Sequence, residues 1–235
     1  MPAGLQVFGD EGQVQIDGSS PHITLLRKGT VVSEAEYGAT QTNTSFAYIG
    51  VMPNEILAFR PAGGQYGNVF GRNGNTVTMI VTGGRTPIDY WVFSRHVPSG
   101  LNYGMQLFDE NETMIYDTGR AVMNVLGTHD GTGGPVAWSA QGVALIPWQT
   151  YAGIERRIEY LPAGALGSPD YMMFIISTLG IAAISGNMTY STNSPIAANA
   201  AGPYSGSGVG APSGWTYIGN NGVDNRFMVI STDNL

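Results

Sequence analysis

Apolar and polar side chains alternate along two stretches of the chain that match each other residue by residue. Gly4 to Asp17 reads GLQVFGDEGQVQID, and Gly104 to Asp117 reads GMQLFDENETMIYD. Each stretch has apolar residues at alternate positions, then a polar turn, then alternation again, which predicts a β-hairpin. The glycine, glutamine, phenylalanine and closing aspartate are identical and in register. The chain is therefore interpreted as duplicated.

A large ring stands beside the polar turn of each hairpin. Phe8 and Phe108 occupy this position in the first and second copy. Because burying a phenylalanine contributes roughly 1.5 to 3 kcal/mol, a ring at this place can anchor a hairpin. We therefore expect Phe8 and Phe108 to be buried at equivalent places.

The rest of the chain alternates short apolar runs with turn signals. His22 to Ser33 predicts a strand, a turn at Gly29 and a second strand start. Ile88 to Arg95 predicts a strand with large rings on both faces, so both faces are expected to be covered. Strand spacing of this kind is typical of an all-β sandwich or barrel. Further strands are predicted at residues 45–51, 55–60, 69–70, 76–81, 120–126, 136–139, 143–146, 155–160, 171–178, 181–185 and 227–231.

The second hairpin follows a break in the pattern at Val97 to Gly100 (VPSG). The sequence therefore predicts two β-sandwich-like domains, residues 1–100 and 101–235, each opening with the repeated hairpin. Residues 187–221 consist almost wholly of small and polar residues and predict one long loop in the second domain. A loop of this length is usually functional or mobile. Its aromatic residues include Tyr204, Trp215 and Tyr217.

Composition narrows the range of functions. The formal net charge is −7 and Lys28 is the single lysine, which argues against a protein that mainly binds nucleic acid. The absence of cysteine excludes disulfides, thiolate metal sites and a cysteine nucleophile. The apolar run 172–184 is too short to cross a bilayer as a helix and predicts paired strands. The first residues have no basic or apolar signal region, so no signal peptide is expected.

No pattern of catalytic or metal-binding residues emerges. The three histidines, His22, His96 and His129, do not have the spacing of metal ligands and are expected to be structural. Asp130 lies in a glycine-rich turn that has too few carboxylates to bind calcium. A glycan-cleaving site needs two carboxylates across a cleft, and the sequence does not choose among the candidates. These are Asp17, Asp89, Asp117, Glu155, Glu159 and Asp170. No catalytic residue, metal or cofactor is assigned.

The two hairpins resemble a family of tail-tip and tail-fibre-associated structural proteins of tailed bacteriophages. The family phrase GLQVF-(N/D)-x-x-G-x-x-x-x-D is matched by residues 4–17, and its second occurrence by residues 103–118. Two intervening phrases of the family are matched by KGTV at 28–31 and DYWVF at 89–93. The resemblance covers residues 3–127. The second copy departs from it at Glu112, where the family often has glycine.

The resemblance implies a non-enzymatic virion component of a tail tip, baseplate or tail fibre, made without a signal peptide. Its partners would be other phage tail proteins and further copies of itself, with a threefold arrangement as the natural candidate around a tail axis. One alternative is a carbohydrate- or receptor-binding module of the tail, in which Tyr204, Trp215 and Tyr217 stack on a host glycan. If these three rings do not bind a glycan, we expect them to hold the loop to the core or to a neighbouring subunit. A glycan-cleaving tail enzyme is a third interpretation.

Overall fold

The computed structural model describes residues 6–8, 14–17, 22–36, 44–95, 99–101, 104–109, 111–129, 135–147, 154–162, 170–205 and 226–235. Within them, residues 6–8, 14–17, 35–36, 154–162, 170–180 and 193–205 are described by their backbone alone. The strands, in chain order, are β1 (Gln6–Phe8), β2 (Val14–Asp17), β3 (Ile23–Val32), β4 (Ala35–Glu36), β5 (Thr44–Gly50), β6 (Ile56–Pro61), β7 (Gly67–Asn73), β8 (Thr76–Thr82), β9 (Pro87–Arg95), β10 (Gln106–Phe108), β11 (Met114–Asp117), β12 (Asn124–His129), β13 (Val136–Ala137), β14 (Val143–Pro147), β15 (Ile154–Pro162), β16 (Asp170–Ser185), β17 (Met188–Ser205) and β18 (Phe227–Ser231).

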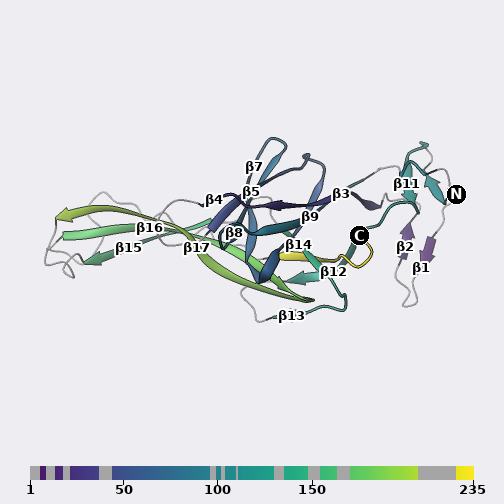
Figure 1. Ribbon diagram of the computed structural model, residues 1–235. Helices are drawn as coiled ribbons and strands as arrows, with labels where there is room; N and C mark the ends of the chain where they lie inside the picture. The colour runs from purple at the N-terminus through teal and green to yellow at the C-terminus, as the bar shows by residue number, and fades with distance from the viewer. Residues whose placement is uncertain are drawn as a thin grey trace.

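The fold is an all-β, sandwich-like arrangement of antiparallel sheets, which confirms the predicted fold class (Figure 1). The first sheet has the strand order β12-β18-β14-β6-β9-β3. The second has the order β13-β17-β16-β7-β8-β5-β4, and β15 also pairs with β16. Within the described residues the helical structure is a single 3-10 turn, η1 (Ala62–Gly64), and no helix is long and apolar enough to span a membrane.

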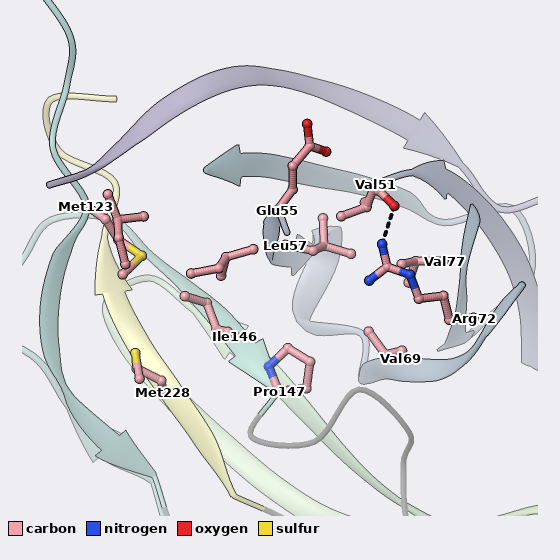
Figure 2. A pocket seen from close by; sticks show the side chains of 12 residues that line it. Val51, Glu55, Leu57, Val69, Arg72, Val77, Met123, Ile146, Pro147 and Met228 are labelled. Atoms are coloured by element: carbon pink, nitrogen blue, oxygen red, sulfur yellow. Dashed lines mark hydrogen bonds between the residues drawn. The ribbon is translucent and has the colours of Figure 1, made fainter. Parts of the chain in front are cut away.

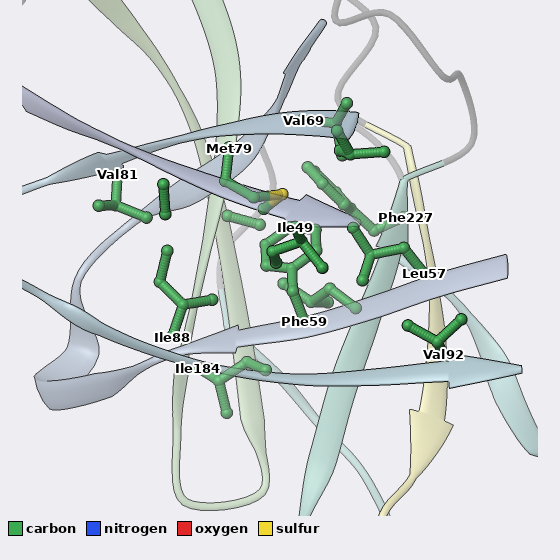
Figure 3. Close-up of a cluster of buried hydrophobic side chains, with 14 of the residues drawn as sticks. Ile49, Leu57, Phe59, Val69, Met79, Val81, Ile88, Val92, Ile184 and Phe227 are labelled. Atoms are coloured by element: carbon green, nitrogen blue, oxygen red, sulfur yellow. The ribbon is translucent and has the colours of Figure 1, made fainter. Parts of the chain in front are cut away.

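The main core lies between the two sheets, where their inner faces meet (Figure 3). Alternation along the strands places Phe59 of β6, Ile88 and Val92 of β9, and Phe227 of β18 in this core. Met79 of β8 contacts them from the second sheet. All five side chains are fully buried. Packing of this kind is the main favourable contribution to the stability of such a fold.

The outer face of the first sheet carries an apolar cluster of its own. Trp91 and Phe93 of β9 pack there with Ala58 of β6 and Ile230 of β18, and all four are buried. The expectation that both faces of β9 are covered is therefore confirmed. The guanidinium carbon of Arg60 lies 5.1 Å from the centroid of the Trp91 ring, so the arginine shields part of the indole from solvent.

Strands from both halves of the chain build both sheets, and neither sheet divides at residue 100. β14 and β18 extend the first sheet beside β6, while β16 joins the second sheet beside β7. Phe59 shares one core with Leu145 and Phe227 from beyond the expected boundary. One sandwich therefore replaces the predicted pair of domains, 1–100 and 101–235. The physical reason is that later strands both pair with earlier ones, β14 beside β6 and β16 beside β7, and add apolar side chains such as Leu145 and Ile184 to the same core.

The turn predicted at Gly29 is also corrected by the structure. β3 runs without interruption from Ile23 to Val32 and pairs with β9, with Gly29 opposite Tyr90. A Cβ on Gly29 would lie 2.8 Å from the Tyr90 hydroxyl, so the glycine makes room for the tyrosine ring across the strand pair. Gly29 therefore marks a close approach within a strand, not a turn.

The predicted loop 187–221 begins as a strand. β17 covers residues 188–205 and pairs along its length with β16, from Ser185 opposite Met188 to Asp170 opposite Ser205. β15 and the far ends of β16 and β17 extend away from the sandwich in Figure 1. Small side chains favour loops statistically, but they do not prevent backbone pairing with a long apolar neighbour. Residues 206–221 of the predicted loop lie outside the described part of the chain.

Candidate functional site

The two repeated stretches form hairpins with the same register. Gln6 pairs with Asp17 and Phe8 with Val14 in the first, just as Gln106 pairs with Asp117 and Phe108 with Met114 in the second. A register shift before the phenylalanine occurs at the same place in both. Each hairpin is a two-stranded sheet separate from the sandwich, and both lie at the end opposite the tips of β15 to β17 in Figure 1. The duplicated sequence therefore forms a duplicated structure.

Three of the four identical residues have a structural role in the second hairpin. Gly104 has φ 114°, a conformation that favours glycine, and a Cβ there would collide with Thr118 Oγ1. The buried Asp117 carboxylate accepts hydrogen bonds from Ser99 N (2.9 Å), Gln106 Nε2 (3.1 Å) and Gly119 N (2.7 Å). Gly104, Gln106 and Asp117 therefore fix the entry, the pairing and the exit of the hairpin.

The fourth identical residue has no such role. Phe108 is 56% exposed and belongs to none of the buried clusters of the described residues, so the prediction that it is buried is wrong. The register shift leaves Ile115 as the extra residue of β11, and Ile115 is buried in place of the phenylalanine. Bulges of this kind redirect neighbouring side chains. The side chain of Phe8 is outside the described residues.

Two further exposed apolar side chains precede β10, and we call these two and the phenylalanine together the hairpin patch: Leu101, Met105 and Phe108. Leu101 and Met105 are each 40% exposed. The sequence does not predict that Leu101 and Met105 are exposed, because alternation shows which positions share a face and not whether that face is covered. The one sequence feature that points to Met105 is its match to Leu5 in the first copy, which keeps an apolar side chain before β10.

The second hairpin is attached to the sandwich through the start of β3. His22 N donates to Ile115 O at 2.9 Å, and the His22 ring packs edge-on against Tyr116 with ring centroids 5.2 Å apart. Leu25 N also donates to Ala121 O at 2.8 Å. These contacts hold the base of the hairpin, while the hairpin patch remains exposed.

The turn of the second hairpin compensates for its lack of glycine. Asp109 Oδ1 accepts hydrogen bonds from Asn111 N (2.9 Å) and Thr113 N (2.8 Å), which closes the turn and lowers the pKa of the carboxyl group. Glu112 nevertheless has φ 61°, where the first copy has Gly12. A side chain in this left-handed conformation is strained by roughly 1 kcal/mol.

We therefore expect Glu112→Gly to stabilise the hairpin against local opening by about 1 kcal/mol. Hydrogen exchange of the hairpin amides would measure the change. Asn111→Gly is the matched control, because Asn111 is exposed in the same turn without a positive φ, and this change should weaken the turn. Slower exchange in the control than in Glu112→Gly would contradict the assignment of strain.

A second expected result concerns Asp117. Replacing it by asparagine places an amide group among three N–H donors, and we expect the free energy of local opening to fall by about 1.5 to 3 kcal/mol at pH 7.

The pKa of Asp117 lies well below its ordinary value of 3.8, because the carboxylate accepts hydrogen bonds from the backbone N–H and side chain of Ser99, and then from Gly119 and Gln106. The contribution of Asp117 is therefore complete above about pH 4 and is lost as the pH falls through the lowered value. Hydrogen exchange of Ser99 and Gly119 should differ between wild type and Asp117→Asn at pH 7, and this difference should shrink in acid. A constant difference across pH would contradict it.

Two further candidates whose side chains are described, Asp89 and His129, are engaged in hydrogen bonds within the fold. Asp89 accepts hydrogen bonds from Thr30 and Arg60 at 2.8 and 3.0 Å. Buried His129 has Nδ1 2.6 Å from Thr189 Oγ1 and Nε2 3.0 Å from Ser191 Oγ. The expectation of a hydrogen-bonded structural histidine is thus confirmed for His129. The described residues hold no cluster of three or more histidine, aspartate or glutamate side chains that could bind a metal.

Several other sequence candidates cannot be placed by their side chains. His96, Asp130, Trp215 and Tyr217 lie outside the described residues. Tyr204 pairs through its backbone with Tyr171 in β16 and β17, and its side chain is not described. The same holds for a group of acidic candidates that lie on strands described by their backbone: Asp17, Glu155, Glu159 and Asp170.

Comparisons of the chain with protein-family models, with curated proteins and with solved structures find no match. Interpretation of the hairpins therefore rests on their geometry and on the sequence resemblance.

Proposed function

We propose that this chain is a non-enzymatic structural subunit of a bacteriophage tail tip, baseplate or tail fibre, and that its repeated hairpins attach it to neighbouring tail proteins. The observation that carries the proposal is the exposure of Phe108 within a repeat that keeps it. Gly104, Gln106 and Asp117 are explained by the geometry of the hairpin itself. The geometry of the hairpin does not explain Phe108, so the presence of this phenylalanine in both copies supports a contact outside the chain.

The physical chemistry of the hairpin patch supports a protein partner. A two-stranded hairpin is marginally stable alone, and covering it would stabilise it. Aromatic side chains are enriched at protein interfaces, where they often act as anchors. The hairpin patch contributes three exposed apolar side chains, in a chain whose charged residues are only 11% of the total. Interface centres are depleted of charge in the same way.

Homo-oligomerisation is part of the proposal. Identical chains most often assemble with closed symmetry, and a subunit placed around a tail axis would take a threefold arrangement. Each chain then offers two hairpins of the same geometry to its neighbours. The mass of the purified chain in solution tests this part, because a trimer has three times the mass of a single chain. A stable monomer at all concentrations would contradict it.

Location in the virion tests the function itself. Negative-stain imaging of the phage with gold-labelled antibody against this chain should place label at the distal tail. Antibody against the capsid protein is the control for access and specificity. Label on the capsid, or purified virions without the chain, would overturn the proposal. A glycan- or receptor-binding role would instead rest on Tyr204, Trp215 and Tyr217, none of which has a described side chain.

A further inference from the structure

A cavity of about 430 Å³ opens where two strands of the first sheet separate. β6 and β14 are joined by a single register pair, Phe59 opposite Leu145. Beyond that pair β6 continues along β9, and β14 continues along β18. The ends of β6 and β14 therefore diverge, and the cavity lies between them, next to the loop before β6 (Figure 2).

The wall of the cavity is mostly apolar. Apolar side chains from several strands and from the loop before β6 contribute to it, among them Val51, Leu57, Val69, Val77, Ile146 and Met228. Several of these residues also contribute to the inner core, so the cavity continues the core outward. A volume of this size falls within the range of roughly 300 to 1,000 Å³ that is usual for small-molecule sites.

Two charged residues line the cavity, Glu55 and Arg72. Glu55 is already paired, because Arg27 donates to both of its carboxylate oxygens, at 3.0 and 2.9 Å. Met52 N also donates to Glu55 Oε2 at 2.8 Å. The Arg27 hydrogen bonds lower the pKa of Glu55, so the carboxylate is ionised and balanced at neutral pH.

Arg72 has no carboxylate among its hydrogen-bond acceptors in the described residues. Its Nε donates to Gly74 O at 3.1 Å and its Nη2 donates to Val51 O. Both acceptors are neutral carbonyl groups, and Nη1 has no hydrogen-bond partner among the described residues. Figure 2 shows the Arg72 guanidinium on the same side of the cavity as Val69 and Val77, with Ile146 and Met228 on the other side. Arg72 also acts on Glu55 through space, after the stronger hydrogen bonds from Arg27, so Arg27, Glu55 and Arg72 together carry one net positive charge in a chain of net charge −7.

We propose that this cavity binds an amphipathic anion, a straight alkyl chain with a carboxylate head, with the head on Arg72 and the chain among the apolar residues. The apolar wall and the guanidinium group of Arg72 complement the two ends of such a molecule. A cation would meet Arg72 as a like charge, and a neutral alkyl chain would leave Nη1 without a partner. The site is distinct from the hairpin patch and does not depend on the tail function.

Isothermal titration of the full chain with decanoate, below its micelle concentration, tests the proposal. We expect saturable binding to one site, with each methylene removed from the chain weakening it about fourfold. Decanol should bind more weakly than decanoate, and decylammonium should not bind at this site. Absence of saturable binding by decanoate, or equal affinities for the acid and the amine, would overturn the proposal.

Variants locate the head group. Arg72→Gln should weaken decanoate binding by about 10- to 100-fold, because it removes a charge-assisted hydrogen bond. Arg60→Gln is the matched control: it removes the same charge from an arginine on the outer face that contacts Asp89 and Trp91, and binding should not change. Arg72→Lys keeps the charge and should restore much of the affinity, which also covers the case of a poorly folded glutamine variant. Equal losses in Arg72→Gln and Arg60→Gln would reject the assignment.

Discussion

A Phe108→Ser variant is expected to fold as the wild type does and to be excluded from the assembled tail. The ring is more than half exposed, so its removal takes little apolar area out of the folded chain. A central aromatic anchor of an interface typically contributes 2 kcal/mol or more, which corresponds to a loss of affinity of roughly 30-fold. We therefore expect incorporation into virions to fall at least about tenfold in competition with wild type. Quantitative mass spectrometry of purified virions would measure the ratio.

Tyr48→Ser is the matched control for Phe108→Ser. Tyr48 is another exposed aromatic residue, 61% exposed, but it lies on β5 of the sandwich and not on a hairpin. Its variant should enter virions like the wild type. If Phe108→Ser is incorporated as well as Tyr48→Ser, the hairpin patch is not a docking surface, and the argument from the repeated phenylalanine fails.

Phe59→Ala is expected to destabilise the whole sandwich by about 3 to 5 kcal/mol, because it removes a fully buried ring from the centre of the shared core. Unfolding should remain a single transition, since Phe59 packs with residues of both halves of the chain. Denaturant unfolding followed by far-ultraviolet circular dichroism would give the free energy. Hydrogen exchange in β18 should accelerate together with exchange in β6.

A conservative change separates packing from loss of fold. Phe59→Leu keeps an apolar side chain at the same place and should cost less than Phe59→Ala while preserving the single transition. Fragments 1–100 and 101–235 expressed separately should not form stable sandwiches, because each lacks strands of both sheets. Two well-separated unfolding transitions, or a stably folded fragment 1–100, would contradict the single core.

The local features of this fold could be predicted from the sequence because their signals are local. Alternation gave the two hairpins and both covered faces of β9, as seen at Trp91 and Val92. The order of the strands could not be predicted in this way. The pairing of β6 with β14 joins Phe59 to Leu145, which are far apart in the chain, and nothing at either residue specifies the other. Local signals near residue 100 therefore predict a domain boundary, but the pairing of strands from both sides of this residue joins them in one sandwich.

The candidate sites were only partly visible in the sequence, for physical reasons. The repeat identified Phe108, but alternation does not reveal that a bulge buries Ile115 and exposes the ring. The cavity proposed to bind an alkyl chain has no signal in the sequence. Arg72 is an ordinary arginine in a glycine-rich hairpin until the fold places it beside Leu57 and Ile146. The net positive charge of Arg27, Glu55 and Arg72 depends on the pairing of Glu55 with Arg27, which only the three-dimensional structure reveals.

Electron cryomicroscopy of the intact tail tests the central claim most directly, because it shows both the location of this chain and the contacts of its hairpins. The proposal predicts density for several copies around the distal tail axis, with Phe108 buried against a neighbouring subunit. It also predicts that the first hairpin occupies an equivalent contact. A tail that lacks the chain, or one in which both hairpins face solvent, would contradict the proposal.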